Sequence, residues 1–73
     1  MKMDLSCLGG VLESFYKEDL ENPHLTTTSI TIEENGKTIA RGTAADIKDG
    51  LKDKYDRKII GWDAYFHIVT LTI

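Results

Sequence analysis

The sequence predicts a single α+β domain in which an antiparallel or mixed sheet packs against one or two helices. Three observations support this fold class. Residues 29–41 have the pattern of a β-hairpin, residues 44–55 have that of a capped amphipathic helix, and residues 65–73 are almost continuously apolar, β-branched or aromatic. A chain of 73 residues is long enough for one domain, so we expect that domain to span residues 1–73.

The first 20 residues combine two patterns. Apolar and polar residues alternate over residues 1–7, which favours a short strand, and apolar residues at helical spacing follow. We place a break at Gly9-Gly10, because each glycine inside a helix costs about 1 kcal/mol relative to alanine. The resulting prediction is a helix over residues 11–20, which must end before Pro23 because proline disfavours helical geometry at the preceding residue.

The hairpin over residues 29–41 has the strongest local signature in the chain. Asn35-Gly36 accepts the positive φ angles that a two-residue type I′ turn requires at both positions. That turn gives each strand one face richer in isoleucine and one polar face. The predicted pairs are Glu34 with Lys37, Glu33 with Thr38, Ile32 with Ile39, Thr31 with Ala40 and Ile30 with Arg41.

A helix over residues 44–55 is predicted next. Thr43 and Asp46 have the spacing of a capping box at its start. Its apolar stripe consists of Ala44, Ile47, Leu51 and Tyr55. Two final strands are predicted over residues 58–62 and 65–73, with a break near Asp63-Ala64. Because the last segment is apolar at both alternating sets of positions, we expect a central strand that is covered on both faces and that includes His67.

Composition and charge limit the function classes. The formal net charge is −3, which disfavours nucleic-acid binding because such proteins usually carry a basic surplus. No apolar run approaches the roughly 20 residues of a membrane helix, and no segment has the pattern of a signal peptide. The single cysteine, Cys7, cannot form an internal disulfide, which favours the reducing cytoplasm. A small domain without such bridges often gains stability by oligomerisation, so we expect a homodimer.

Charge is divided unevenly along the chain. Residues 1–36 contain two basic and seven acidic residues, whereas residues 37–73 contain seven basic and five acidic residues. The division is compatible with two ordinary solvated faces or with an electrically two-ended molecule that contacts a charged partner.

Catalytic and cofactor sites are not evident. Cys7 with His24 or His67 as base is the one nucleophile pair available, but the spacing supplies no third orienting group, and we place no helix N-terminus beneath Cys7. One cysteine and two distant histidines lack the paired spacing of metal ligands. Gly9-Gly10 matches no phosphate-binding fingerprint. We therefore expect no enzyme activity, no cofactor and no bound metal.

Contact residues are expected in two places. Basic side chains lie beside aromatic ones over residues 52–66, and acidic ones end the first hairpin strand. Aromatic and arginine side chains are frequent interface anchors. Trp62 and Phe66 could equally fill the core beneath a helix. The candidate partner or ligand contacts are Arg57, Lys58, Trp62, Tyr65, Glu33 and Glu34.

The function that the sequence favours is a small non-enzymatic interaction module that binds or inhibits a protein partner through a strand edge or an aromatic patch. A compact acidic α+β domain with a Thr43-capped helix between a hairpin and a final strand is similar to many short proteins of phages and mobile elements. This resemblance implies action by binding, for example by blocking a host factor. Two alternatives are an oligomer that binds a small anionic ligand or nucleotide through Arg57, Lys58 and Trp62, and a nucleic-acid-associated regulator.

Overall fold

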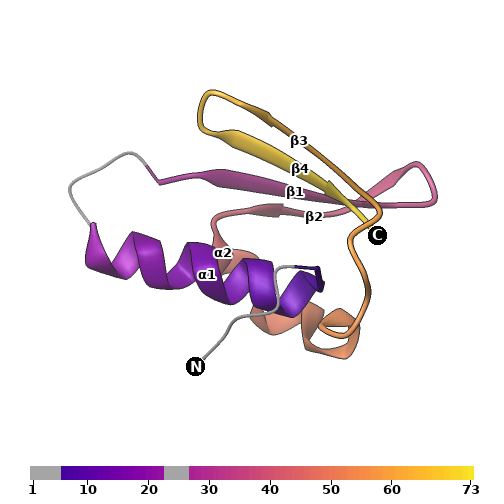
Figure 1. The fold of residues 1–73 in the computed structure, drawn as a ribbon, viewed down its shortest axis with the longest axis horizontal. Helices are drawn as coiled ribbons and strands as arrows, with labels where there is room; N and C mark the ends of the chain where they lie inside the picture. Colours follow the sequence, from indigo (N-terminus) through magenta and orange to yellow (C-terminus); the bar gives the residue numbers. More distant parts are fainter. Residues whose placement is uncertain (1–5, 23–26) are drawn as a thin grey trace.

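The structure, a computed structural model, describes residues 6–22 and 27–73 as a mixed four-stranded sheet with helices on one face (Figure 1). In chain order the elements are helix α1 (Leu8–Glu21), strands β1 (Ser29–Glu34) and β2 (Lys37–Gly42), helix α2 (Ala44–Ile47), the 3-10 helix η1 (Asp49–Lys54), and strands β3 (Gly61–Tyr65) and β4 (Ile68–Thr72). The strand order is β2-β1-β4-β3, with β1 and β4 parallel and the other neighbours antiparallel. The predicted α+β class is confirmed; most of the strand expected over residues 1–7 lies outside the described residues.

The core lies between the helices and the two central strands. Ile30 and Ile32 of β1 are completely buried, and Val69 and Leu71 of β4 are nearly so. The helical side of this core is formed by Leu8, Leu12, Ala44, Ile47 and Leu51. The opposite face of the sheet is not covered by any described helix (Figure 1). The central strands β1 and β4 thus supply the sheet side of the core, and β2 and β3 are the edge strands.

Helix α1 begins three residues earlier than predicted and contains both Gly9 and Gly10. Gly9 is buried against Tyr55, and a Cβ atom at this position would lie 2.8 Å from Cβ and Cγ of that tyrosine. The first amides of the helix donate to distant backbone carbonyls, Leu8 to Arg57 and Gly9 to Tyr55. The break predicted at the glycines is therefore wrong, because a close tertiary contact requires glycine inside the helix despite its low propensity.

The predicted β1–β2 hairpin is confirmed, with φ angles of 53° at Asn35 and 80° at Gly36. Its register agrees with the prediction next to the turn and then shifts at a β-bulge between Ile32 and Glu33. Beyond the bulge Ile32 pairs with Ala40 rather than Ile39, Thr31 with Arg41 rather than Ala40, and Ile30 with Gly42 rather than Arg41. The shift moves Arg41 off the face that packs on the helices, where an unpaired charge would be costly to bury.

The helix predicted over residues 44–55 is instead two short helices, α2 and η1. The capping box is confirmed, since the Asp46 backbone amide donates to Thr43 Oγ1 and the Thr43 amide donates to an Asp46 carboxylate oxygen. The predicted apolar stripe also packs inward through Ala44, Ile47 and Leu51. The tighter 3-10 geometry begins at Asp49, just before Gly50, where helix propensity is low.

The two final strands form a hairpin whose turn is Phe66-His67 rather than Asp63-Ala64. Residues 58–60 are not part of β3. Lys58 bridges Cys7 and the Ile59 amide donates to the Ser6 carbonyl, whereas the Ile60 amide already donates to the Thr72 carbonyl of β4. His67 consequently lies exposed in the turn instead of within a strand. Strand β4 is central as predicted, but helices cover only one of its faces, and Ile68 is 51% exposed on the other.

Candidate functional site

The six contact residues predicted from the sequence separate into two groups. Arg57 and Glu34 pair with each other, with Nη1 of the arginine 2.7 Å from Oε2 of the glutamate. Lys54 Nζ lies 3.7 Å from the other oxygen of the same carboxylate. These ion pairs tie the end of β1 to the segment that follows η1. Arg57 and Glu34 therefore have a role within the fold, which the sequence spacing did not reveal.

The remaining four candidates lie apart from that ion pair. Lys58 is exposed beside its bridge to Cys7, and Glu33 is half-buried on the uncovered face of the sheet. Trp62 and Tyr65 lie on β3, where they are 71% and 70% exposed. The question of whether Trp62 is a core or a surface residue is thereby settled in favour of the surface.

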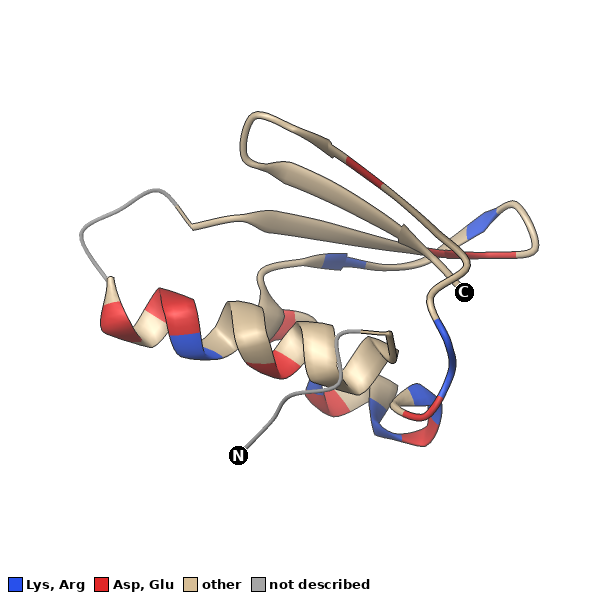
Figure 2. Ribbon diagram, viewed as in Figure 1, with Lys and Arg blue, Asp and Glu red and all other residues tan. Residues whose placement is uncertain are grey.

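The two charge classes are only partly separated in the folded chain. The charged residues of helix α1 are mostly acidic, with Lys17 among them, and Figure 2 shows acidic and basic positions mixed through the segment that contains η1. Glu34 from the acidic half pairs with Lys54 and Arg57 from the basic half. Part of the charge division along the sequence is therefore neutralised within the fold.

Large apolar side chains are exposed on and around β3. We call this set the β3 surface; it consists of Ile60, Trp62, Tyr65, Phe66 and Ile68, with exposed fractions of 76%, 71%, 70%, 85% and 51%. The rings of Tyr65 and Phe66 meet edge to face, with centroids 4.5 Å apart. Trp62 lies on the helix side of β3, whereas Tyr65 and Ile68 lie on the other side, so the set surrounds the edge strand. Exposed large apolar side chains of this kind are typical of interaction sites.

A groove with a volume of about 360 Å³ opens beside the β3 surface. Its walls come from α1 on one side and from β3, β4 and the segment before β3 on the other. Trp62 forms part of the wall, and Glu18 supplies the one charged side chain. The lining residues are Val11, Ser14, Phe15, Glu18, Ile59, Trp62 and Leu71. The groove is thus an apolar slot with a carboxylate beside it, directly under the edge strand.

The turn between β3 and β4 has an unfavourable backbone conformation. Phe66 has a φ of 55°, in the left-handed region, and its side chain is 85% exposed. For a non-glycine residue this conformation costs about 1–2 kcal/mol. Because the exposed ring packs on little besides Tyr65, folding alone does not explain a phenylalanine here. Strain of this kind concentrates at functional positions.

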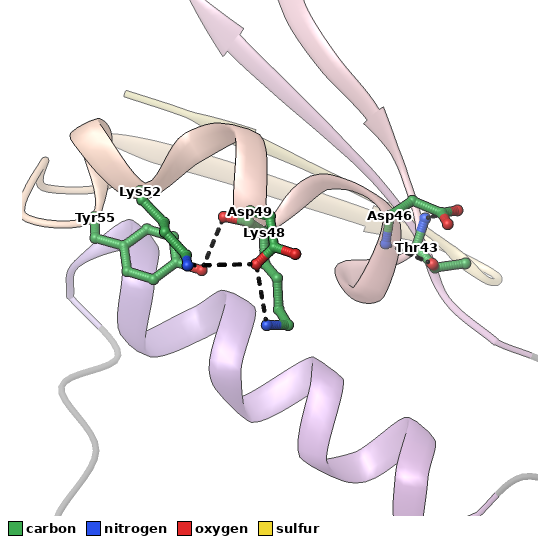
Figure 3. A network of polar contacts seen from close by, with 6 residues as sticks. All are labelled: Thr43, Asp46, Lys48, Asp49, Lys52 and Tyr55. Atoms are coloured by element: carbon green, nitrogen blue, oxygen red, sulfur yellow. Dashed lines mark hydrogen bonds and ion pairs between the residues drawn. The ribbon is translucent and has the colours of Figure 1, made fainter.

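A second polar cluster fixes η1 on α1 and is structural (Figure 3). The Tyr55 hydroxyl donates to the Lys48 carbonyl at 2.9 Å, and Lys48 Nζ lies 3.4 Å from Asp49 Oδ1 and 4.7 Å from the ring centroid of Tyr16. Burial, followed by the charge of Glu13, raises the pKa of Tyr55. The hydrogen bond to Asp49 raises the pKa of Lys48. Both groups therefore keep their protons at neutral pH.

The thiol considered from the sequence lies at the start of α1. Cys7 is the N-cap residue of this helix, contrary to the expectation that no helix N-terminus lies beneath it, and its side chain is half-buried without a capping hydrogen bond. Of the two candidate bases, His67 is in the β3–β4 turn and His24 lies outside the described residues. The amides of Leu8 and Gly9 already donate to the Arg57 and Tyr55 carbonyls, so these two amides are not open to an anion. Within residues 6–22 and 27–73, no three metal-binding side chains gather.

The sequence missed part of this site. Ile60 and Ile68 flank β3 without any exposed-patch signature, and the turn at Phe66 carries none of the usual turn residues. Val11 and Phe15 are four residues apart, a spacing that places both on one face of α1, and this was the one available signal for the groove wall.

Comparison with known proteins supplies no information on function. No protein-family model, curated protein or solved structure matches the chain. In the part of the chain that the structure describes, none of the helices has the length and apolarity to cross a membrane.

Proposed function

We propose that the protein is a small binding module that attaches to a partner protein through the β3 surface. The observation that carries the proposal is the exposure of five large apolar side chains on and around one edge strand, four of them 70% exposed or more. Burying a side chain of this kind contributes about 1.5–3 kcal/mol, which the free protein forgoes. A partner that covers β3 would recover that free energy.

The types of residue at this surface support a protein partner. Tryptophan and tyrosine supply large contact areas with few rotatable bonds, and they dominate the energetics of many interfaces. Trp62 and Tyr65 point to opposite faces of β3, since their strand partners are the buried Leu71 and the exposed Ile68. A partner must therefore wrap around the edge. Any partner surface held there would be blocked, so the same contact accounts for the expected inhibitory action.

A small apolar ligand in the groove is the second candidate, because about 360 Å³ lies within the usual range of ligand pockets. The groove suits an apolar or cationic molecule, since Glu18 is its one charged lining residue. This differs from the anionic ligand or nucleotide expected from the sequence, for which Arg57 is already occupied by Glu34. The homodimer and the cytoplasmic location stay predictions.

Affinity capture with matched variants tests the proposal. Wild-type protein, Trp62→Ala, Phe66→Gly and the control Leu20→Ala are immobilised, and bound proteins from the source cells are quantified by mass spectrometry. Leu20 is a suitable control because it is 63% exposed on α1 but does not line the groove. We expect one partner to bind the wild type and the control, and to bind the purified β3 variants at least tenfold more weakly. Equal binding to all four proteins would refute the proposal.

A further inference from the structure

We infer that the partner contributes an extended basic segment, which adds to the sheet as a fifth strand beside β3. The inference rests on the proposed function and specifies the chemistry of the partner. It follows from three features of the edge: an open backbone, an alternation of side chains between two faces, and an unpaired acidic group, Asp63, on the face away from the groove.

The backbone edge of β3 is open among the described residues. Strand order places β3 at the end of the sheet, where it pairs with β4 alone. Five successive pairs from Gly61 to Tyr65 hold a regular register with no bulge. Residues 62–65 are all exposed. A regular and exposed edge of this kind is a template for main-chain pairing with another chain.

The side chains of β3 set the pattern that an added strand must match. Trp62 and Ala64 pair with the buried Leu71 and Val69, so they lie on the helix-covered face. Asp63 and Tyr65 lie on the opposite face. Because successive side chains of a strand alternate between faces, every second residue of an added strand would project toward the groove. The lining of that groove favours large apolar side chains at those positions.

The charge of β3 indicates that the other residues of the added strand, which project away from the groove, are basic. Asp63 is exposed in the middle of β3, on the face away from the groove. No basic side chain in residues 6–22 or 27–73 forms an ion pair with its carboxylate. Opposite charges across paired strands are stabilising. A segment that alternates lysine or arginine with large apolar residues therefore complements this edge.

A second copy of the chain fits the same edge less well. The protein carries a net charge of −3, so two copies repel each other. An antiparallel pairing of two β3 strands about their midpoint would also place Asp63 opposite itself, and like charges in that position are destabilising. The repulsion between two acidic chains and the contact between two Asp63 side chains both disfavour a second copy. We therefore infer that the occupant is a basic segment of a different protein.

A synthetic peptide tests the inference directly. The probe has seven residues in which lysine alternates with isoleucine, and both of its ends are blocked. Trp62 is the single tryptophan, so its fluorescence reports the site. We expect saturable binding with a blue shift, and about fivefold weaker binding to Asp63→Lys. The control Glu21→Lys makes the same charge change at the end of α1, away from the groove, and should change affinity less than twofold.

Two further peptides separate strand pairing from simple attraction. A version with N-methylated interior amides retains every side chain but cannot pair as a strand, and it should not bind. A version with glutamate in place of lysine should bind at least tenfold more weakly. Equal binding of either peptide would overturn the inference. Circular dichroism of each protein variant verifies that a lost signal is not lost folding.

Two outcomes in the free protein also bear on the occupant. A dimer by light scattering, with β3 amides protected from exchange before any peptide is added, would overturn the inference in favour of a second copy. Failure of every alternating peptide to bind would overturn it as well. The proposed function would survive that second result if capture of a cellular partner still depended on Trp62, so the two ideas fail separately.

Discussion

The two hairpins of this protein have the same two-residue loop length but different chemistry. At the β1–β2 turn the residues with positive φ are Asn35 and Gly36, which adopt that conformation readily. At the β3–β4 turn the residue with positive φ is Phe66, which does not. The first turn therefore follows local preference, whereas the second holds a strained aromatic residue in solvent. Under the proposed function, the first turn serves folding and the second serves contact with the partner.

The two edge strands differ in how strongly their features discourage pairing with another chain. Strand β2 has a bulge in its pairing and two exposed cations, Lys37 and Arg41, which are features that discourage pairing with another chain. Strand β3 has a regular register, and aromatic side chains surround its single charge, Asp63. One edge is thus protected and the other is open, which directs any added strand to β3.

The largest expected difference in stability is between a substitution in a central strand and one in the open edge strand. Ile32 on β1 is completely buried, so Ile32→Ala should lower the free energy of unfolding by about 3 kcal/mol. Trp62→Ala should lower it by less than about 0.5 kcal/mol because the indole is mostly in water. Urea denaturation measures both. The reverse order would mean that Trp62 belongs to the core.

The two turns should respond in opposite directions to substitution. Gly36→Ala places a side chain at a φ of 80° and should cost about 1 kcal/mol. Phe66→Gly relieves the strain at a φ of 55°, so stability should stay the same or rise by up to about 1 kcal/mol. Thermal unfolding of the two variants checks this pair. A large loss of stability in Phe66→Gly would show that the ring supports the fold.

The connection between the hairpins depends on Tyr55. Tyr55→Phe removes the hydrogen bond to the Lys48 carbonyl and should cost about 1 kcal/mol at neutral pH. Because burial raises the pKa of Tyr55 in the folded state, its contribution is complete below pH 10 and is lost as pH rises further. The pKa of Lys48 is also raised, so its contribution to stability is likewise lost as pH rises.

Urea unfolding between pH 8 and pH 11 is the measurement for this prediction. The wild type should lose more stability over that range than Tyr55→Phe, and the loss that remains in the variant is assigned to Lys48. Identical pH profiles would exclude Tyr55 as a source of the alkaline dependence.

The smallest expected effect concerns the ion pairs at the end of β1. Glu34→Gln weakens contacts to Arg57 and Lys54 and should cost about 0.5 kcal/mol, since the arginine is half-exposed. The loss should shrink in 1 M salt, where charges are screened within about 3 Å. Glu33→Gln is the neighbouring control. A loss unaffected by salt would point to packing instead of charge.

Sequence patterns predicted the elements whose causes are local. The Asn35-Gly36 turn and the Thr43 cap depend on residues within a few positions, and both are present. The helical state of Gly9 depends on Tyr55, which is distant in sequence, so local propensity could not predict it. The bulge after Ile32 likewise depends on which side chains the helices can accept.

The candidate site was predictable to a similar extent. Trp62 and Tyr65 were identified by residue type, because aromatic residues are common interface anchors, and both are exposed. Arg57 and Glu34 were selected on the same basis but pair with each other, a relation that only the folded chain reveals. Phe66 was assigned to a strand because its turn carries no turn signature.

Amide hydrogen exchange on the two edge strands tests the central claim most directly. In the free protein, the outward amides of β2 and β3 should both exchange rapidly, since neither edge is paired. With the alternating basic peptide or the captured partner bound, we predict slower exchange in Gly61–Tyr65 and no change in Lys37–Gly42. Slower exchange in β2, or binding that leaves β3 unprotected, would contradict the assignment of β3 as the binding edge.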